Sequence, residues 1–224
     1  MKYIHDEIIH NHVDPAILVP IFLNLFRPAS VCDIGCGTGN FLQAFKTNGI
    51  PKVLGLDGAW ANKELISKHL TDTEFRTVDF EGLLPIFSEK FDLSLCLEVA
   101  EHISERNADS FIEFLIRTAN SIIFSAAIPG QGGYNHLNEQ WEEYWEEKFL
   151  KAGYRKYDVI RHLIINNTSV SWWYRQNIVV YSRNNLDHLP KIELSNIVVR
   201  ENYFNKLIQI NNQNIFINHL QNKA

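Results

Sequence analysis

The sequence predicts an α/β fold: a mostly parallel sheet of seven strands with helices on both faces and an antiparallel last strand. Three observations support this. Short runs typical of strands alternate with stretches of helical spacing through the first half of the chain. Two further strand-like runs follow without the same alternation. With 224 residues, of which 46% are hydrophobic, the chain is long enough to bury the core of one domain.

The first expected element is a helix over residues 14–26, with Asp14 as its N-cap and Pro15 at the first helical position. Strands and helices then alternate, which implies parallel strands covered by helices. The expected strands are residues 30–34, 52–57, 74–78, 91–97 and 121–126, and the expected helices are residues 39–48, 61–70 and 105–119.

The second half of the chain changes its pattern. Residues 138–149 predict a helix with Asn138 as N-cap and acidic residues in the first turn. Residues 154–163 and 169–183 predict two strands, which as an antiparallel pair would end the sheet. From residue 184 the composition becomes rich in asparagine. We therefore expect a helical cap at 1–29, a core domain at 30–183 and an extension at 184–224 that packs on the core or forms a homodimer contact.

The composition argues against several classes of protein. Lys and Arg number 21 against 26 Asp and Glu, a net charge of -5, whereas binding through nucleic-acid phosphates needs a basic excess. The three cysteines form no pair or motif and suit a reduced, cytoplasmic protein. No segment approaches the ~20 apolar residues of a membrane span, and the first residues lack a secretory signal. The expected partner is a small molecule or glycan, not nucleic acid.

A glycine-rich loop separates the first expected strand from the next helix. Gly35, Gly37 and Gly39 follow a G-x-G-x-G pattern, and glycines let the backbone turn sharply and approach a ligand. A dinucleotide-binding loop would have its third glycine at Asn40 instead. Asp33, just before the loop, can pair with a cationic amino group, which a pyrophosphate does not offer.

Acidic residues end the next strands. Asp57 lies where a carboxylate accepts hydrogen bonds from both hydroxyls of a ribose. Asp79 follows the third strand and can accept from an adenine amino group, while Phe80 can pack on the base. The fourth strand runs into Glu98.

Four motifs in this order, DIGCGTG, GLD, VDF and FDLSLCLEVAEHI, resemble the class I S-adenosylmethionine-dependent methyltransferases over residues 28–183. The resemblance implies a Rossmann-like fold, a methyltransferase core at residues 30–183 and S-adenosylmethionine as the cofactor. The alternative for the motif residues is a set of strand-end turns with solvated carboxylates. The cofactor contacts that the resemblance implies are Asp33, Gly35, Gly37, Gly39, Asp57, Gly58, Asp79, Phe80, Leu97 and Glu98.

Two absences bear on the acceptor. The Asn/Asp-Pro-Pro-Tyr run of amino-methylating enzymes is missing after the fourth strand, where Leu97, Glu98 and Val99 stand, which favours a hydroxyl acceptor. No cysteine has a setting suited to a nucleophile, which argues against a covalent route.

A metal site is a further hypothesis. Glu98, Glu101 and His102 are spaced to share one helical face, and His136, beyond the fifth strand, could add a fourth ligand. Carboxylate and imidazole ligands suit Mg²⁺, Mn²⁺ or Zn²⁺. The set is similar to that of ubiquinone-pathway and small-RNA O-methyltransferases, in which it holds a divalent ion. Without metal, Glu98 and His102 would line the cofactor pocket and His136 would act as general base. His136 and Glu101 are the candidate catalytic residues.

Two aromatic clusters are candidates for the acceptor site. Trp141 and Tyr144 belong to a stripe whose usual role is core packing. Trp173, Arg175 and Asn177 could stack on and hydrogen-bond a sugar or nucleotide. The stretch that holds both clusters resembles a methyltransferase group associated with glycan and polysaccharide biosynthesis.

The sequence thus predicts an O-methyltransferase that acts on a hydroxyl of a sugar or glycoconjugate, with Mg²⁺ or Mn²⁺ as an assisting ion. One alternative is a small-RNA 2′-O-methyltransferase, which would need a basic groove. Another is a catalytically silent subunit that keeps only the cofactor fold.

Overall fold

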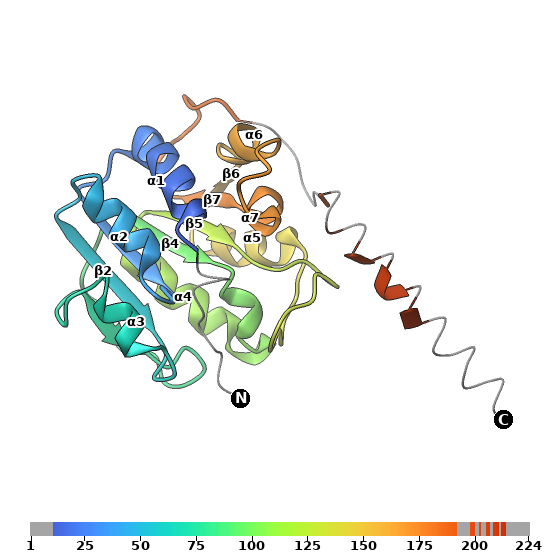
Figure 1. Ribbon diagram of the computed structural model, residues 1–224, viewed down its shortest axis with the longest axis horizontal. Coiled ribbons are helices and arrows are strands. Elements are labelled where there is room, and N and C mark those ends of the chain that lie inside the picture. The colour runs from blue at the N-terminus through green and yellow to red at the C-terminus, as the bar shows by residue number, and fades with distance from the viewer. Residues whose placement is uncertain are drawn as a thin grey trace.

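In the computed structural model of the protein, residues 11–191 are described, together with residues 198, 199, 202, 205, 206, 208–210, 212 and 213. Seven strands form one sheet in the order β3-β2-β1-β4-β5-β7-β6 (Figure 1). β7 runs antiparallel to both of its neighbours, and the other pairings are parallel. The expected mostly parallel sheet with an antiparallel last strand is confirmed.

The strands of the first half follow the expected pattern closely. The expected strands 30–34 and 52–57 match to the residue, while those at 74–78, 91–97 and 121–126 are each shorter by one or more residues. Phe91 still forms an isolated parallel bridge to Ala119 ahead of its strand. The strands are β1 (Ser30–Ile34), β2 (Lys52–Asp57), β3 (Phe75–Thr77), β4 (Leu93–Leu97), β5 (Ser121–Ser125), β6 (Arg155–Tyr157) and β7 (Val179–Ser182).

Helices cover both faces of the sheet, and short 3-10 turns at Ala100–His102 and Glu105–Asn107 precede α4. The helices are α1 (Val13–Phe26), α2 (Asn40–Thr47), α3 (Lys63–Ser67), α4 (Ala108–Thr118), α5 (Glu142–Lys151), α6 (Arg161–Ile164) and α7 (Trp172–Asn177). Among the described residues, no helix is both long and apolar enough to cross a membrane.

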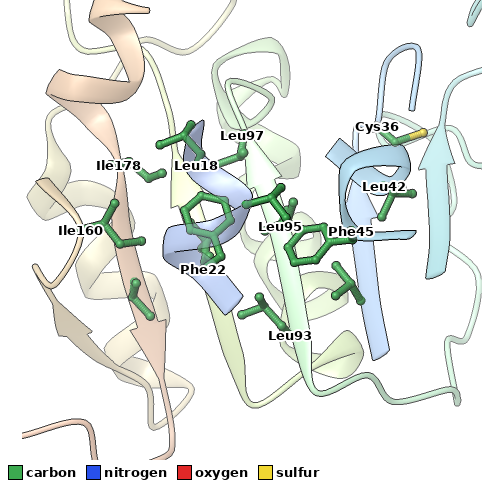
Figure 2. Packing of buried hydrophobic residues seen from close by; sticks show 14 of the residues in the cluster. Leu18, Phe22, Cys36, Leu42, Phe45, Leu93, Leu95, Leu97, Ile160 and Ile178 are labelled. Carbon is green, nitrogen blue, oxygen red and sulfur yellow. The ribbon is translucent and has the colours of Figure 1, made fainter. Parts of the chain in front are cut away.

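The core consists of two apolar layers separated by the sheet. Successive residues of a strand point to opposite faces, so Leu95 of β4 packs in one layer and Cys96 in the other. Figure 2 shows the first layer, in which Phe22 of α1 lies close to Phe45 of α2 and against Leu95. Because α1 contributes buried residues to this layer, it is integral to the sheet packing. The first ten residues of the expected N-terminal cap lie outside the described part of the chain.

Two expected helix starts are wrong. α1 has His12 as its N-cap, and the Oδ1 atom of Asn11 accepts the first N–H groups. The Asp14 carboxylate is not a cap because it accepts hydrogen bonds from Ser171 instead. α5 begins later than expected, with Trp141 as N-cap. Asn138 lies in the preceding loop, where its N–H donates to the carbonyl of Glu101.

The two strands expected near the end of the domain form only in part. Of residues 154–163, three are in β6, and α6 follows. Residues 169–183 contain α7 and then β7, so Trp172–Asn177 is a helix and not a strand. Aromatic residues favour strands only where a pleated surface is available. Here three consecutive residues at the end of a helix, Arg175, Gln176 and Asn177, are all buried. A half-buried strand would instead alternate buried and exposed residues.

Candidate functional site

A cleft of about 630 Å³ opens at the carboxyl ends of the parallel strands, which is the usual ligand site of such sheets. Eleven of the residues expected to form the site line it: Asp33, Gly35, Asp57, Asp79, Phe80, Leu97, Glu98, Glu101, His102, His136 and Trp173. The other seven do not: Gly37, Gly39, Gly58, Trp141, Tyr144, Arg175 and Asn177.

The glycine loop between β1 and α2 depends on a backbone that other residues rarely adopt. Gly35, Gly37 and Gly39 have φ angles of 75°, 57° and 84°. The Gly35 N–H donates to the carbonyl of Leu56 at 2.7 Å, which fixes the loop to the end of β2. A Cβ atom on Gly35 would lie only 2.3 Å from a methyl group of Val99. A larger residue at Gly35 would therefore both strain and displace the loop.

Asp57 joins this loop to β2. Its carboxylate accepts the Gly37 N–H at 2.8 Å and the Gly58 N–H at 2.6 Å. Burial raises the pKa of Asp57 to about 6, although these two hydrogen bonds act in the opposite direction. Gly37 and Gly58 thus support the cleft through Asp57 and not as lining residues.

Asp33 is a buried carboxyl group that needs a partner. It is 4% exposed, lines the cleft, and accepts no side-chain hydrogen bond from any described residue. Burial raises its pKa to about 8, and the neighbouring Asp57 adds to the shift. The Thr38 hydroxyl, also in the lining, is buried and has no partner within the described ranges. These groups fit a ligand with a cationic amino group, such as the methionine part of S-adenosylmethionine.

Next to Asp57 the cleft has an aromatic rim. Asp79 is exposed there and accepts the Glu81 N–H at 3.0 Å, while the Phe80 ring packs against Phe111 with 5.5 Å between centroids. Trp60, which the sequence reasoning missed, is 38% exposed and lines the cleft. A Cβ on Gly58 would lie 2.2 Å from the Trp60 ring, so a larger residue at this position would displace the ring. An aromatic residue three positions after the strand-end aspartate was the available signal.

Beyond the end of β4, three possible metal ligands meet. Glu101, His102 and His136 each offer an atom within 4.8 Å of the others, and the two imidazole centroids are 5.0 Å apart. The His102 Nδ1 atom lies 3.1 Å from the carbonyl of Asn135, and the His136 Nδ1 atom lies 2.8 Å from Glu139 Oε1. Oxygen acceptors at Nδ1 favour the tautomer that leaves Nε2 as the ligand atom, which is typical of metal-binding histidines.

The charges of this cluster also fit a cation. Glu101 is fully buried, and neither carboxylate oxygen has a hydrogen-bond partner of ordinary geometry among the described residues. Burial raises the pKa of Glu101 well above its usual range, and the charge of Glu98 adds to this. Burial lowers the pKa of His102, and the hydrogen bond to Asn135 opposes that shift. A divalent cation would favour the ionised carboxyl and the neutral imidazole.

The helical face expected for Glu98, Glu101 and His102 does not form. Glu98 has a φ of 55° and precedes the short turn that holds the other two. Its carboxylate accepts from the Gln131 and Asn177 side-chain amides at 3.0 and 3.1 Å, so Glu98 lies outside the three-residue cluster. Burial raises the pKa of Glu98, and these amide donors counteract it.

A glutamate that the sequence reasoning missed organises the loop that carries His136. The Glu139 carboxylate accepts the Gly130 and Gly132 N–H groups at 2.6 and 2.7 Å, besides its contact with His136. The Leu137 N–H donates to the Glu101 carbonyl at 2.8 Å, which ties the loop to the cluster. An acidic residue soon after a glycine-rich loop was the available signal.

The residues expected to bind the acceptor are separated by the fold. Trp173 lines the cleft together with Trp172 and Tyr174. Arg175 is buried, and its guanidinium donates to the carbonyls of Val170 and Ile165 at 2.9 and 3.3 Å. The Asn177 side-chain amide donates a hydrogen bond to Glu98, but Asn177 does not line the cleft. Outside the lining, Trp141 remains partly exposed, and Tyr144 packs edge-on against Trp145.

Known proteins are similar to parts of this chain. Residues 31–120 match a family model described as Methyltransferase domain. A ubiquinone biosynthesis O-methyltransferase from Bartonella quintana is 33% identical over 112 residues, which cover 48% of this chain and 42% of that protein. The matches to curated relatives span less than half of their length.

Solved structures share the fold at low identity. A sugar N-methyltransferase from Streptoalloteichus sp ATCC 53650 matches with a TM-score of 0.61 and 14% identity, covering 83% of this chain and 94% of its own. The magnesium protoporphyrin IX methyltransferase from Synechocystis PCC 6803 with bound SAH matches with a TM-score of 0.56 and 18% identity, covering 77% and 84%. Together with the ordered motifs at the strand ends, these matches show that residues 31–120 are similar to a methyltransferase domain and that the fold is one found in S-adenosylmethionine-dependent methyltransferases.

Proposed function

We propose that this protein transfers the methyl group of S-adenosylmethionine to a hydroxyl of a sugar or glycoconjugate, with Mg²⁺ or Mn²⁺ held by Glu101, His102 and His136. The observation that carries the proposal is that one cleft is lined both by Asp33 and Asp57 and by this three-residue cluster. Its two parts suit a cationic nucleoside cofactor and a chelated oxygen acceptor.

In this proposal, the cofactor lies along the strand ends. Asp33 pairs with the amino group, since its buried carboxyl has no described partner. Asp57 accepts from the ribose hydroxyls while it holds the loop. Asp79 accepts from the adenine amino group, and the Trp60 and Phe80 rings flank the base. Leu97 and Glu98 line the cleft between the cofactor and the acceptor.

Methyl transfer is an in-line displacement, so the main task of the protein is to align the acceptor oxygen with the methyl group. Without a bound metal, His136 would take the hydroxyl proton at Nε2, and Glu139 at Nδ1 would stabilise the resulting imidazolium. A bound divalent cation would lower the pKa of the acceptor hydroxyl. Glu101, His102 and His136 would hold that cation, and His136 Nε2 would then be a ligand and not a base.

Support for a sugar acceptor comes from the lining and from relatives. Trp172, Trp173 and Tyr174 present aromatic surface to the cleft, on which a sugar ring can pack. A structural neighbour is a sugar N-methyltransferase, and a curated relative is a ubiquinone biosynthesis O-methyltransferase. The net charge of -5 disfavours an RNA acceptor.

The test is methyl transfer from labelled S-adenosylmethionine to a panel of sugars, nucleotide sugars and short RNA, with and without EDTA. We expect labelling of a sugar hydroxyl that EDTA abolishes and Mn²⁺ restores. Glu101→Gln and His136→Ala should each lower turnover by about 100-fold or more, whereas the exposed His188→Ala should not. Labelling of RNA alone would overturn the proposed sugar acceptor. Turnover that neither EDTA nor either substitution changes would overturn the proposed metal site.

A further inference from the structure

A chain of side-chain amides leads from the cleft into the protein. Glu98, in the cleft wall, accepts from Gln131 and Asn177. The Gln131 Oε1 atom in turn accepts from Asn177 and from Gln176, at 3.0 and 3.2 Å. Gln176 is almost fully buried and also donates to Asn177 Oδ1 at 3.0 Å. Glu98, Gln131, Asn177 and Gln176 thus form one closed network.

This network continues to the C-terminal extension. The Gln176 Oε1 atom accepts the backbone N–H of Val199 at 3.1 Å and the Asn202 side-chain amide at 3.0 Å. Val199 and Asn202 are both buried. The described part of the extension therefore packs on the domain, which was one of the two arrangements the sequence left open.

The extension also reaches the loop that carries His136. A Cβ atom on Gly130 would lie 3.3 Å from Lys206 Nζ, and one on Gly132 would lie 3.7 Å from Gln209 Nε2. Gly130 and Gly132 are the residues whose N–H groups bind Glu139. The Lys206 Nζ atom donates a hydrogen bond to Gln209 Oε1 at 3.1 Å. The described residues of the extension therefore lie beside this loop and are also linked to it through Gln131.

The direction of the hydrogen bonds is fixed at both ends. A carboxylate can only accept, so Gln131 and Asn177 must present their NH₂ groups to Glu98. Their oxygens then face Gln176, which must donate to them and turn its own oxygen toward the extension. The backbone N–H of Val199 can only donate, and this is the group it meets. A carboxylate at one end and a backbone N–H at the other thus require the same orientation of every amide.

We propose that Gln131, Gln176 and Asn202 are positioning residues that couple docking of the C-terminal extension to Glu98 and to the loop that carries His136. The extension is then a support of the acceptor side of the cleft. This inference goes beyond the proposed reaction and requires neither cofactor nor acceptor.

The first test is hydrogen exchange at the Val199 amide in the full chain. Glu98→Gln places an NH₂ group where two donors already point, so the amides can no longer all be satisfied. We expect the Val199 amide to exchange about fivefold faster or more, the effect of one weakened hydrogen bond. A folded Glu98→Gln protein that exchanges at the wild-type rate would overturn the proposal.

The second test runs in the opposite direction, because coupling is reciprocal. Asn202→Asp keeps the shape of the side chain but removes its donor to Gln176. We expect faster exchange at the Gly130 and Gly132 amides, while Asn212→Asp, at an exposed position of the same segment, leaves them unchanged. This second test decides the question if Glu98→Gln fails to fold. Wild-type exchange rates at the Gly130 and Gly132 amides in Asn202→Asp would overturn the proposal. Both tests use the protein alone, so a failure of the proposed methyl transfer would not affect them.

Discussion

The part of the cleft lined by Asp33 and Asp57 and the part lined by Glu101, His102 and His136 are held in place differently. In the first, which we propose binds the cofactor and call the cofactor half, backbone N–H groups at the ends of neighbouring strands bind a strand-end carboxylate. In the second, which we propose binds the acceptor and call the acceptor half, side chains from a short turn and a long loop meet through further side chains and carbonyls. A half built on backbone is fixed by the fold, whereas a half built from side chains can differ among members of the same fold.

The largest effect expected within this comparison comes from Asp57→Ala. It removes the hydrogen bond that the carboxylate accepts from Gly37 in the glycine loop and the one from Gly58, and bonds to a charged group contribute about 1.5–3 kcal/mol each. We expect the affinity for S-adenosylhomocysteine, measured by calorimetry, to fall by about 100-fold or more. Asp72→Ala, in an exposed turn, is the matched control. Wild-type affinity in Asp57→Ala would mean that the loop does not form the cofactor half.

A smaller effect should appear as pH dependence. With a pKa of about 8, the Asp33 carboxyl is protonated at neutral pH in the free protein. A cationic ligand requires the carboxylate, so the affinity for S-adenosylhomocysteine should rise by up to about tenfold per pH unit and level off near pH 8. Asp33→Asn should bind weakly and lose this dependence. A pH-independent affinity in the wild-type protein would contradict the pairing.

The same group gives a second measurement in the absence of ligand. Its pKa is raised from an ordinary value of 3.8, so its stabilising contribution is complete below pH 4 and is lost as the pH rises through about 8. Asp33→Asn should remove this loss. The free energy of unfolding, measured by chemical denaturation, should therefore be lower for the wild-type protein than for Asp33→Asn at pH 9 but not at pH 5.

The contrast between the halves explains what the sequence could predict. β1 and β2 match the expected strands to the residue, and the glycine loop between them is contiguous, so Asp33, Gly35 and Asp57 could be placed from local pattern alone. A buried parallel strand, a glycine turn and a strand-end carboxylate each carry a local signal. Trp60 was missed although it follows the same motif, because its position over Gly58 depends on packing.

In the acceptor half, local patterns predicted residue types better than geometry. Glu101, His102 and His136 meet as a cluster, but Glu98 does not join them because its left-handed backbone turns it toward Gln131. The helix spacing that suggested a shared face applies only if a helix begins at Glu98. Asn138 and Asp14 are also residue types that are common at N-caps, yet both form tertiary contacts instead. Contacts between residues far apart in sequence override local propensity.

The smallest effect tests whether the two halves are independent. Asp14 lies at the start of α1, and its carboxylate accepts the Ser171 N–H and hydroxyl at 2.7 and 2.6 Å. Ser171 directly precedes Trp172 and Trp173 in the cleft wall, so this contact joins α1 to the acceptor half. Asp14→Ala should lower the free energy of unfolding by about 1–3 kcal/mol in chemical denaturation. Asp14→Asn, whose amide oxygen still accepts the Ser171 N–H, should lower it less.

Independent halves predict a further result for the same variant. The Asp14 contact touches neither the glycine loop nor Asp57, so the affinity of Asp14→Ala for S-adenosylhomocysteine should stay within about threefold of the wild-type value, less than 1 kcal/mol. A loss as large as that expected for Asp57→Ala would show that α1 and α7 close on the cofactor as one unit. The cofactor half would then depend on side-chain contacts as much as the acceptor half does, and the distinction between them would fail.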